Sequence, residues 1–226
     1  MGKTISIAID GPAGAGKSTI AKRLAAELGF YYVDTGAIYR TAAYFMDLLG
    51  ISPKDVDGVE RYIDELNIDI YYDETGLQHM LMNNIDVTDD IRTPDISQKA
   101  SLISAHSVVR EMLLDMQRDV ARENNVVMDG RDIGTVVLPK ADVKIFLTAS
   151  AEVRAQRRYE ELKAKGSKDS YEKVLKDLQQ RDYQDTHREI APLKMARDSI
   201  KVDTSEMNTD AVVAAIREIV QQKVGV

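Results

Sequence analysis

The segment DGPAGAGKST, residues 10–19, combines residue types and spacing that suit phosphate chemistry. It satisfies the pattern G-x-x-x-x-G-K-[ST] at Gly11, Gly16, Lys17 and Ser18. In this pattern successive backbone N–H groups converge on phosphates, and the following helix adds a favourable dipole. Lys17 is expected to reach the β- and γ-phosphates of a nucleoside triphosphate, and the Ser18 hydroxyl to bind Mg²⁺. The residues predicted to bind the triphosphate are Gly11, Pro12, Ala13, Gly14, Ala15, Gly16, Lys17, Ser18 and Thr19.

The sequence around this segment supports the phosphate-binding interpretation. A β-rich apolar run at residues 4–10 precedes it and a helical pattern follows it, which is the context that the motif requires. That context favours a phosphate cradle over a tight glycine turn before an alanine-rich helix. The cradle leaves open whether water or a second substrate takes the terminal phosphate. A GTPase switch would need a guanine-reading N-K-x-D motif, which the sequence lacks, and a motor or large ATPase would need a longer chain.

Polar residues that follow two other strand-like runs could hold a second substrate. Thr35 and Arg40 lie in VDTGAIYR, and Arg131 and Asp132 lie in MDGRDIGT. In doubly wound sheets ligands bind beyond the carboxyl ends of strands, so these residues should face the same crevice as the cradle. An arginine can grip an anion bidentately, and Asp132 could accept from an exocyclic amine or a hydroxyl. Asp129 is placed to support a metal-bound water. The alternatives are a solvated helix arginine at position 40 and a local ion pair between Arg131 and Asp132.

The helical pattern from residue 171 onward changes from apolar to charged along one face. Its apolar positions are Tyr171, Val174, Leu175 and Leu178. Arg181, Asp185 and Arg188 roughly continue the same face at i, i+4 and i+7. A buried stripe that becomes charged where it leaves the core suits a polar cleft, whereas a solvated surface face is the alternative.

The segment KAKGSKDS, residues 163–170, is predicted to be a flexible break between two helices and a candidate mobile lid. Arg154, Arg157 and Arg158 precede it at i, i+3 and i+4, so they should stack on one side of a helix. We expect the closing lid to bring their charge to the transferring phosphoryl group. The alternative is a surface network with the neighbouring carboxylates of Glu152, Glu160 and Glu161.

Five short apolar runs, separated by helical patterns, must position these residues. They lie at residues 4–10, 30–34, 125–129, 143–148 and 198–203. This alternation predicts an α/β fold of the P-loop NTPase type, with a parallel five-stranded sheet flanked by helices. Residues 66–87 instead show period-two stretches around turn residues at 74–76 and 83–84, which predicts a small antiparallel insertion.

One domain accounts for this organisation. We expect a core at residues 1–34, 106–152 and 188–226, an acceptor-binding insertion at about 35–105, and a short helical lid at about 153–187. A chain of 226 residues is long enough for one substantial hydrophobic core.

The composition limits the classes of partner. Lys and Arg number 30 against 37 Asp and Glu, so the net charge of −7 disfavours nucleic acid and anionic membranes as partners. The chain has no cysteine, which excludes disulfides and thiolate metal sites and is compatible with a reducing cytoplasm. No apolar run approaches the ~20 residues of a membrane span, and the first residues are too short for a signal peptide. Gly2 and Ser6 formally fit an N-myristoylation pattern, but a first buried strand is the favoured interpretation. The scattered residues His79, His106 and His187 are expected to be structural, and a monomer is the default expectation.

Taken together, these motifs resemble those of the bacterial cytidylate kinases, which belong to the nucleoside monophosphate kinase group. DGPAGAGKST, VDTGAIYR, DGRDIGTVVLP, KIFLTAS and RD…D…R…APL occur in the order and spacing of that family over essentially the whole chain. The inserted meander also resembles the extra small sheet of the bacterial enzymes. The resemblance implies that the γ-phosphoryl group of ATP passes, with Mg²⁺, to CMP or dCMP.

The resemblance also implies a set of acceptor residues. They are Thr35, Arg40, Ser101, Arg110, Arg131, Asp132, Arg181 and Asp185. Arg40 and Arg131 would hold the acceptor monophosphate, while Ser101, Arg110 and Asp132 would read the cytosine. Ser101 and Arg110 lie in ASLISAHSVVREML, which the sequence pattern predicts to be one helical stretch.

By the same resemblance, Arg181 and Asp185 would bind the ribose hydroxyls. The residues expected to act in catalysis are Lys17, Arg131, Arg158 and Arg188, with Arg157 in the ATP site. Two other hypotheses remain open at this point. One is a small P-loop kinase for another acceptor, such as UMP or a shikimate-like acid. The other, from a different class, is a nucleotide-dependent switch protein.

Overall fold

A parallel sheet of five strands forms the centre of the molecule, as the sequence predicts. In the computed structural model, which describes residues 3–226, the strands are β1 (Ser6–Asp10), β2 (Tyr31–Asp34), β6 (Val126–Gly130), β7 (Val143–Thr148) and β8 (Ile200–Asp203). Their order across the sheet is β2-β6-β1-β7-β8. In the register of the two central strands, Asp10 lies opposite Gly130. The loops that follow β1 and β6 therefore start side by side. Gly2, the residue of the lipidation pattern, lies outside the described residues.

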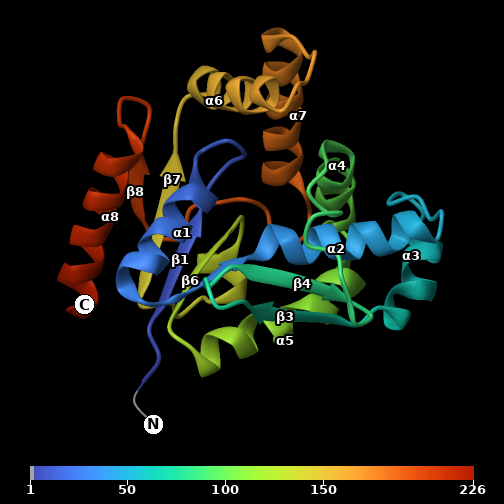
Figure 1. Cartoon of the computed structure of the whole chain (residues 1–226), viewed down its shortest axis with the longest axis horizontal. Helices are drawn as coiled ribbons and strands as arrows, with labels where there is room; N and C mark the ends of the chain where they lie inside the picture. The colour runs from blue at the N-terminus through green and yellow to red at the C-terminus, as the bar shows by residue number, and fades with distance from the viewer. Residues whose placement is uncertain (1–2) are drawn as a thin grey trace.

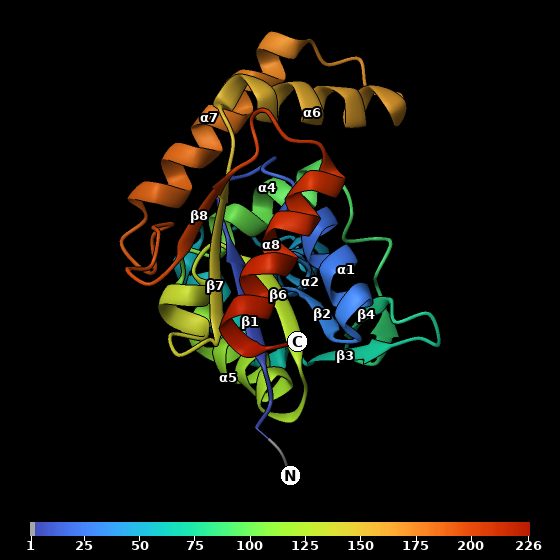
Figure 2. The same cartoon turned by 90° about the vertical axis from the view of Figure 1, so that its left-hand side faces the viewer.

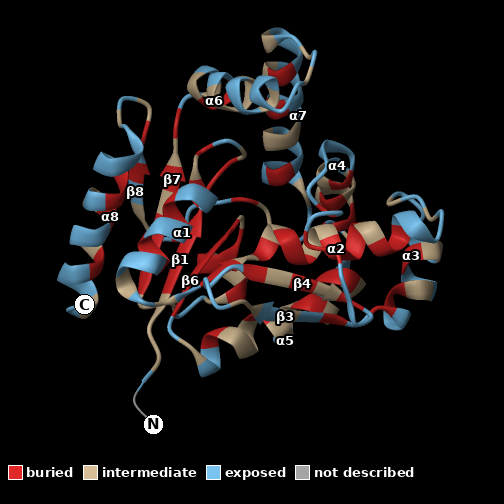
Figure 3. Ribbon diagram, in the orientation of Figure 1, coloured by how far each residue is buried: buried red, intermediate tan, exposed pale blue. Residues whose placement is uncertain are grey.

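Helices cover both faces of this sheet (Figure 1), and most residues of the inner strands are buried (Figure 3). The helices α1 (Lys17–Leu28) and α8 (Thr209–Val224) pack on one face, where Ile7 and Ile9 belong to the core. On the other face, Ala8 and Met128 pack beside α5 (Ser107–Glu123) and the π-helical turn η2 (Ile133–Val137). Because both faces are covered, the strands are mainly apolar, which explains the apolar runs in the sequence.

The predicted insertion forms a second, antiparallel sheet of three strands. Its elements are α2 (Thr35–Leu48), α3 (Val56–Tyr62), η1 (Ile63–Glu65), β3 (Ile68–Tyr72), β4 (Gln78–Met82), β5 (Ile85–Asp86) and α4 (Pro94–Ile103). The second predicted turn is confirmed by the left-handed backbone of Asn83 and Asn84, with φ of 49° and 68°. Such φ values suit asparagine better than most residues. A hydrophobic cluster of its own joins α2, α4 and this sheet to the first turns of α5.

Two polar contacts attach the insertion to the edge of the central sheet. The Oε1 atom of Gln78 accepts from the backbone N–H of Asp34 at 2.7 Å, and the Tyr72 hydroxyl donates to the Tyr32 carbonyl at 3.0 Å. Both partners lie in β2, directly before the helix α2. The insertion is therefore held beside the carboxyl end of β2.

The helices α6 (Ala151–Ala164) and α7 (Tyr171–His187) stand beyond the carboxyl ends of the strands (Figures 1 and 2). The predicted break between them is confirmed, and Gly166 within it has a φ of 83°. Val174 and Leu178 of the apolar stripe are buried. Within residues 3–226, no helix combines the length and the apolar character that crossing a bilayer requires.

One local expectation about the insertion is wrong. The stretch that contains Ser101 and Arg110 is not one helix, because α4 ends at Ile103 and α5 begins at Ser107. The Ser104 hydroxyl donates to the Ser101 carbonyl at 2.9 Å, which satisfies a free carbonyl at the end of α4. His106 is extended, with φ −78° and ψ 128°, and its Nε2 lies 2.8 Å from the Pro53 carbonyl. These side-chain contacts favour a break where the helical pattern continues.

Candidate active site

The phosphate-binding loop leaves β1 through a glycine that no other residue can replace without a shift. A Cβ atom at Gly11 would lie 1.9 Å from the carbonyl oxygen of Leu147, and the φ of Gly11 is 152°. Gly16, with a φ of 88°, is the residue that caps the start of α1. Glycine adopts these conformations without a steric penalty. The loop thus places the N-terminus of α1 beyond the carboxyl end of β1, where a phosphate would meet free backbone N–H groups.

The ammonium group of Lys17 turns back onto this loop. Lys17 is buried, and its Nζ donates to the Pro12 carbonyl at 2.8 Å. Burial, followed by the charge of Arg131, lowers the pKa of Lys17 to about 7. The positive surroundings that disfavour the charged lysine would favour an anionic phosphate in the same place.

Ser18 and Asp129 meet at the other side of the loop. The Ser18 hydroxyl donates to Oδ2 of Asp129 at 3.0 Å, and the Tyr32 hydroxyl donates to Oδ1 at 2.8 Å. Burial and the nearby Asp34 raise the pKa of Asp129. Among the described residues, no group of three or more His, Cys, Asp or Glu could hold a metal ion. Mg²⁺ in kinases is usually held by one or two protein oxygens, substrate phosphates and water, so the Ser18 and Asp129 oxygens fit this ion.

A group of arginines lies next to Lys17. Arg131 donates through Nε to Asp185 at 2.8 Å, and Arg40 donates to Asp34 at 2.9 Å. The Nε atoms of Arg181 and Arg40 are buried and have no hydrogen-bond partner among the described residues. Burial and the charge of Arg131 lower the pKa of Arg181 to about 10. Buried donors without an acceptor are costly, so this cluster is suited to bind an anion that supplies the missing acceptors.

Arg131 and Asp132 do not pair with each other, although they are adjacent in the sequence. The Arg131 guanidinium pairs with Asp185, whereas the Asp132 carboxylate is bound by Arg110 and Arg188. The hypothesis of a local ion pair is therefore wrong. Successive side chains after β6 point to different parts of the site, one toward the phosphate side and one toward α4 and α5.

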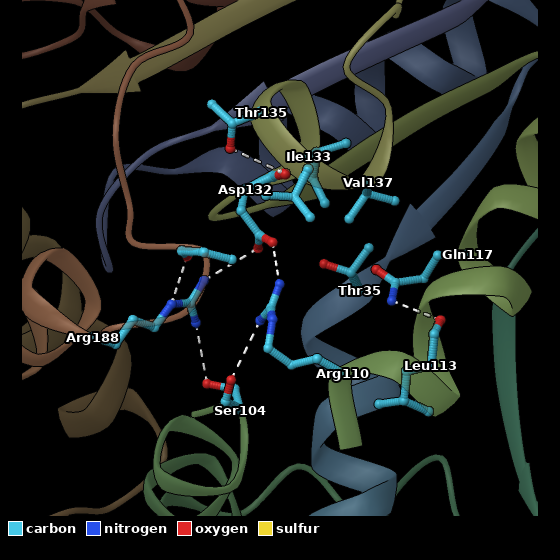
Figure 4. Close-up of polar contacts among 12 residues, drawn as sticks. Thr35, Ser104, Arg110, Leu113, Gln117, Asp132, Ile133, Thr135, Val137 and Arg188 are labelled. Atoms are coloured by element: carbon cyan, nitrogen blue, oxygen red, sulfur yellow. Dashed lines mark hydrogen bonds and ion pairs between the residues drawn. The ribbon is translucent and has the colours of Figure 1, made fainter. Parts of the chain in front are cut away.

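The surroundings of Asp132 form a second polar cluster (Figure 4). Arg110 donates to Oδ2 of Asp132, and Arg188 donates to Oδ1 at 3.2 Å. Both arginines also contact Ser104: Arg110 donates to its carbonyl at 3.3 Å, and Arg188 to its hydroxyl at 3.2 Å. The Arg188 Nε donates to the Ala191 carbonyl at 2.7 Å. These contacts fix the orientation of both guanidinium groups. Three residues of the cluster are almost fully buried: Ser104, Arg110 and Asp132.

Two further predicted residues lie around this cluster. The Ser101 hydroxyl is buried and has no hydrogen-bond partner, so it is free to contact a ligand. The Thr35 hydroxyl instead donates to the Asp129 carbonyl at 2.8 Å, which links α2 to the end of β6. Thr35 therefore already has one backbone partner before any ligand binds.

The three arginines that precede the lid do not act as one group, contrary to the expectation of a common stack. Arg154 is buried, donates to the Ala13 carbonyl at 2.9 Å, and pairs with Asp182 at 2.7 Å. Arg157 binds the hydroxyl and carbonyl of Thr204 at 3.0 and 2.7 Å. Only Arg158 pairs with a neighbouring lid carboxylate, that of Glu161 at 2.8 Å. Their partners come from three different segments, which spacing along one helix does not reveal.

Sequence reasoning missed two residues of the site. Asp10 ends a buried strand next to the cradle. A charged residue at the end of a buried strand could have indicated a polar partner there. Ser104 gave no signal, because its contacts depend on the helix break that the sequence pattern did not predict. Asp10 accepts two backbone N–H groups from the loop after Asp132.

The comparison with known proteins agrees with this geometry. The model of the cytidylate kinase family matches residues 7–222. A cytidylate kinase of Carboxydothermus hydrogenoformans is 50% identical over 96% of this chain and 97% of its own length, and one of Leuconostoc mesenteroides is 45% identical over 96% and 97%. An uncharacterised protein of Eubacterium ventriosum, 13% identical, aligns over 96% of this chain and 99% of its own with a TM-score of 0.52, which shows a shared fold alone. The chain belongs to the cytidylate kinase family.

Proposed function

We propose that this kinase transfers the γ-phosphoryl group of ATP to CMP or dCMP, giving CDP or dCDP in pyrimidine nucleotide metabolism. The observation that carries the proposal is the arginine cluster of Arg40, Arg131 and Arg181. Two of its Nε atoms are buried and lack acceptors, and it lies beside Lys17 of the phosphate loop. An anion bound there would lie between the donor phosphates and the polar cluster around Asp132.

The donor side depends on the loop and the first turn of α1. Backbone N–H groups at the helix N-terminus and the Lys17 ammonium would hold the ATP phosphates. Ser18, with Asp129 through a water, would hold Mg²⁺, which supplies neutralising charge between the phosphates. The two oxygens already lie 3.0 Å apart, as a shared ligand would require.

The acceptor side divides by chemistry. Arg40 and Arg131 would grip the monophosphate, since a guanidinium matches phosphate oxygens bidentately. Arg181 and Asp185 would bind the ribose hydroxyls. Burial raises and Arg131 lowers the pKa of Asp185, and the net effect is a lowered pKa, so this carboxylate stays ionised and can accept from a hydroxyl.

The transfer itself needs positioning and charge more than a base. The acceptor phosphate is already a nucleophile, and the loose transition state spreads negative charge over the transferred group. Lys17 and Arg131 would stabilise that charge, and Arg188 would join them once ligand binding releases it from Asp132 and Ser104. Arg158 would join them when the lid closes and its contact with Glu161 opens, and Arg157 would contact ATP. Closure would also exclude water, which would otherwise hydrolyse ATP.

Selection of the base is assigned to the cluster around Asp132. The carboxylate can accept from the exocyclic amine of cytosine, whereas uracil presents a carbonyl there and would meet unfavourable charge. The Ser101 hydroxyl, buried without a partner, and the Arg110 guanidinium would complete the pocket. We therefore expect turnover of CMP and dCMP well above UMP, and poorest turnover of purine monophosphates.

A substrate panel tests the proposal directly. ATP and Mg²⁺ are combined with CMP, dCMP, UMP, AMP, GMP or shikimate, and the phosphorylated product is followed. Equal turnover of CMP and AMP, or preference for UMP or shikimate, would reject the assignment. ATP hydrolysis without any acceptor preference would favour a switch protein.

The variant Ser101→Ala sharpens this test. Its hydroxyl has no protein partner, so we expect unchanged folding and an approximately tenfold higher KM for CMP, which corresponds to the loss of about one hydrogen bond. The KM for ATP should not change. Ser97→Ala, one turn earlier on the same helix, is the control, because the Ser97 hydroxyl already donates to the Thr93 carbonyl at 2.9 Å. An unaltered KM for CMP would remove Ser101 from the site.

The cellular location and the oligomeric state remain predictions. We propose that the kinase acts in the cytoplasm and as a monomer. Light scattering of the purified protein tests the oligomeric state.

A further inference from the structure

We propose that Asp10 is a positioning residue for acceptor recognition: it holds the loop that carries Asp132 against the start of the phosphate-binding loop. Neither the phosphate-loop motif nor the acceptor set assigned above includes this residue. Its role depends on the proposed role of Asp132 in reading the base. The two roles nevertheless have separate tests.

The contact that carries the proposal is a pair of hydrogen bonds from one carboxylate. Asp10 is the last residue of the central strand β1 and is 3% exposed. Its Oδ1 accepts from the backbone N–H of Ile133 at 2.8 Å, and its Oδ2 from that of Gly134 at 2.7 Å. These are the two residues that directly follow Asp132. A carboxylate held by two N–H groups at once fixes the backbone in direction as well as in distance.

The loop that Asp10 holds is fixed at its other end as well. Residues Ile133–Val137 form a π-helical turn, a rare conformation that is often found at functional sites. Arg118 donates to the carbonyls of Val136 and Val137, both at 3.1 Å. The Asp132 carbonyl accepts from Val136 at 2.8 Å. Asp10 and Arg118 thus hold opposite ends of one turn, and the Asp132 side chain leaves from its start.

The space around Asp10 allows little movement. A Cβ atom at Gly134 would lie 3.2 Å from Oδ2 of Asp10 and 3.2 Å from Cδ of Lys144. On the other side, Gly11 follows Asp10 directly and is confined by the Leu147 carbonyl. The backbone on the phosphate-loop side is therefore held in place, and loss of a hydrogen bond at the Asp10 carboxylate would release the Asp132 loop first.

Keeping a charge in this place is unfavourable, which argues against a carboxylate chosen for stability alone. Burial raises the pKa of Asp10 to about 6, against the opposing effect of the N–H groups of Gly134 and Ile133. The negative charge of Asp132 raises it further, and the positive charge of Lys17 lowers it. At neutral pH the carboxylate is ionised, and both oxygens act as acceptors.

The variant Asp10→Asn tests the proposal, because it keeps the shape but turns one acceptor into an NH₂ group that faces a backbone N–H. We expect a roughly tenfold higher KM for CMP and a similar loss of CMP preference over UMP, with KM for ATP changed less than about twofold. Asp55→Asn is the matched control, because the exposed Asp55 carboxylate also accepts from a backbone N–H, that of Gly58, but at the start of α3. It should leave the kinetic constants unaltered.

A second variant covers the case in which Asp10→Asn fails to fold. Gly134→Ala presses on the same carboxylate from the opposite side while Asp10 remains. It should reproduce the selective loss of CMP binding in weaker form. Equal increases in KM for ATP and CMP with unaltered CMP preference, or no change in either variant, would overturn the proposal. If the unaltered enzyme does not prefer CMP, the proposed function itself fails, which separates the two outcomes.

Discussion

At the scale of single residues, the site concentrates positive charge that lacks a counterion. Lys17 is buried and Arg181 is partly buried beside Arg131, and burial together with the charge of Arg131 lowers their pKa values to about 7 and about 10. The carboxylates of Asp129 and Asp185 oppose this effect without cancelling it. Bound phosphates would supply the missing negative charge. Substrate binding and protonation should therefore be linked.

Lys17 should take up a proton when ATP binds. In the free protein its pKa lies near 7, so at pH 8 the amine is mostly neutral; the phosphates raise the pKa and the charged form returns. We expect uptake of about one proton per ATP at pH 8, measured by titration calorimetry in buffers of different ionisation enthalpy. Lys17→Met should abolish the uptake, and Lys22→Met on the same helix should preserve it. A binding enthalpy independent of the buffer would contradict the prediction.

At the scale of elements, the lid is attached to the phosphate loop by a residue that was expected to contact substrate. Arg154 donates to the Ala13 carbonyl of the loop and to the Ala149 carbonyl before α6, and it pairs with Asp182 of α7. One guanidinium thus joins three segments. Arg158, one turn further along α6, makes only a partly exposed pair with Glu161.

Substitution of Arg154 should lower stability, whereas substitution of Arg158 should lower the catalytic rate. Arg154→Met should lower the free energy of unfolding by about 3 kcal/mol, because it leaves the Asp182 carboxylate and two carbonyls without their donor. Arg158→Met should change it by less than about 1 kcal/mol, since its ion pair is exposed. Arg158→Met should nevertheless lower kcat at least tenfold. Urea unfolding and steady-state kinetics measure the two effects. Loss of stability in Arg158→Met, or unaltered kcat, would refute its proposed role.

At the scale of the whole molecule, three units meet at the carboxyl edge of the sheet: the core, the insertion and the lid (Figure 1). The insertion has its own hydrophobic cluster and touches β2 through the polar contacts of Tyr72 and Gln78. Contacts of this kind can open at a smaller cost than a packed apolar interface. The β2 side of the insertion should therefore open more easily than the side that packs against α5.

Weakening this attachment should affect acceptor binding and little else. Tyr72→Phe removes the hydroxyl that donates to the Tyr32 carbonyl, so amide exchange in β3 and β4 should accelerate while that in β1 and β6 stays unaltered. KM for CMP should rise severalfold, and KM for ATP should not. Tyr71→Phe is the matched control, because its hydroxyl donates to Asp86 within the insertion. Equal exchange in both variants would show that the attachment does not depend on Tyr72.

The sequence by itself determined the fold class and the phosphate-loop motif. Five apolar runs and the helices between them predicted the parallel sheet, because burial on both faces leaves a continuous apolar signature. The period-two stretches around turn residues such as Asn83 and Asn84 predicted the antiparallel insertion, and the left-handed backbone of both asparagines confirms that turn. The phosphate loop was equally readable, since its glycines and Lys17 lie within one short segment. These features are local, so spacing along the chain is enough to reveal them.

Only the tertiary structure decided which charged groups pair with each other. Arg131 and Asp132 are neighbours in sequence but bind Asp185 and Arg110, and Arg154 holds the phosphate loop instead of substrate. The hydrogen bonds from the backbone of Ile133 and Gly134 to the Asp10 carboxylate join residues more than a hundred positions apart. Ion pairs and hydrogen bonds depend on the direction of a side chain and on what lies within a few ångströms, and periodicity along one helix or strand carries neither.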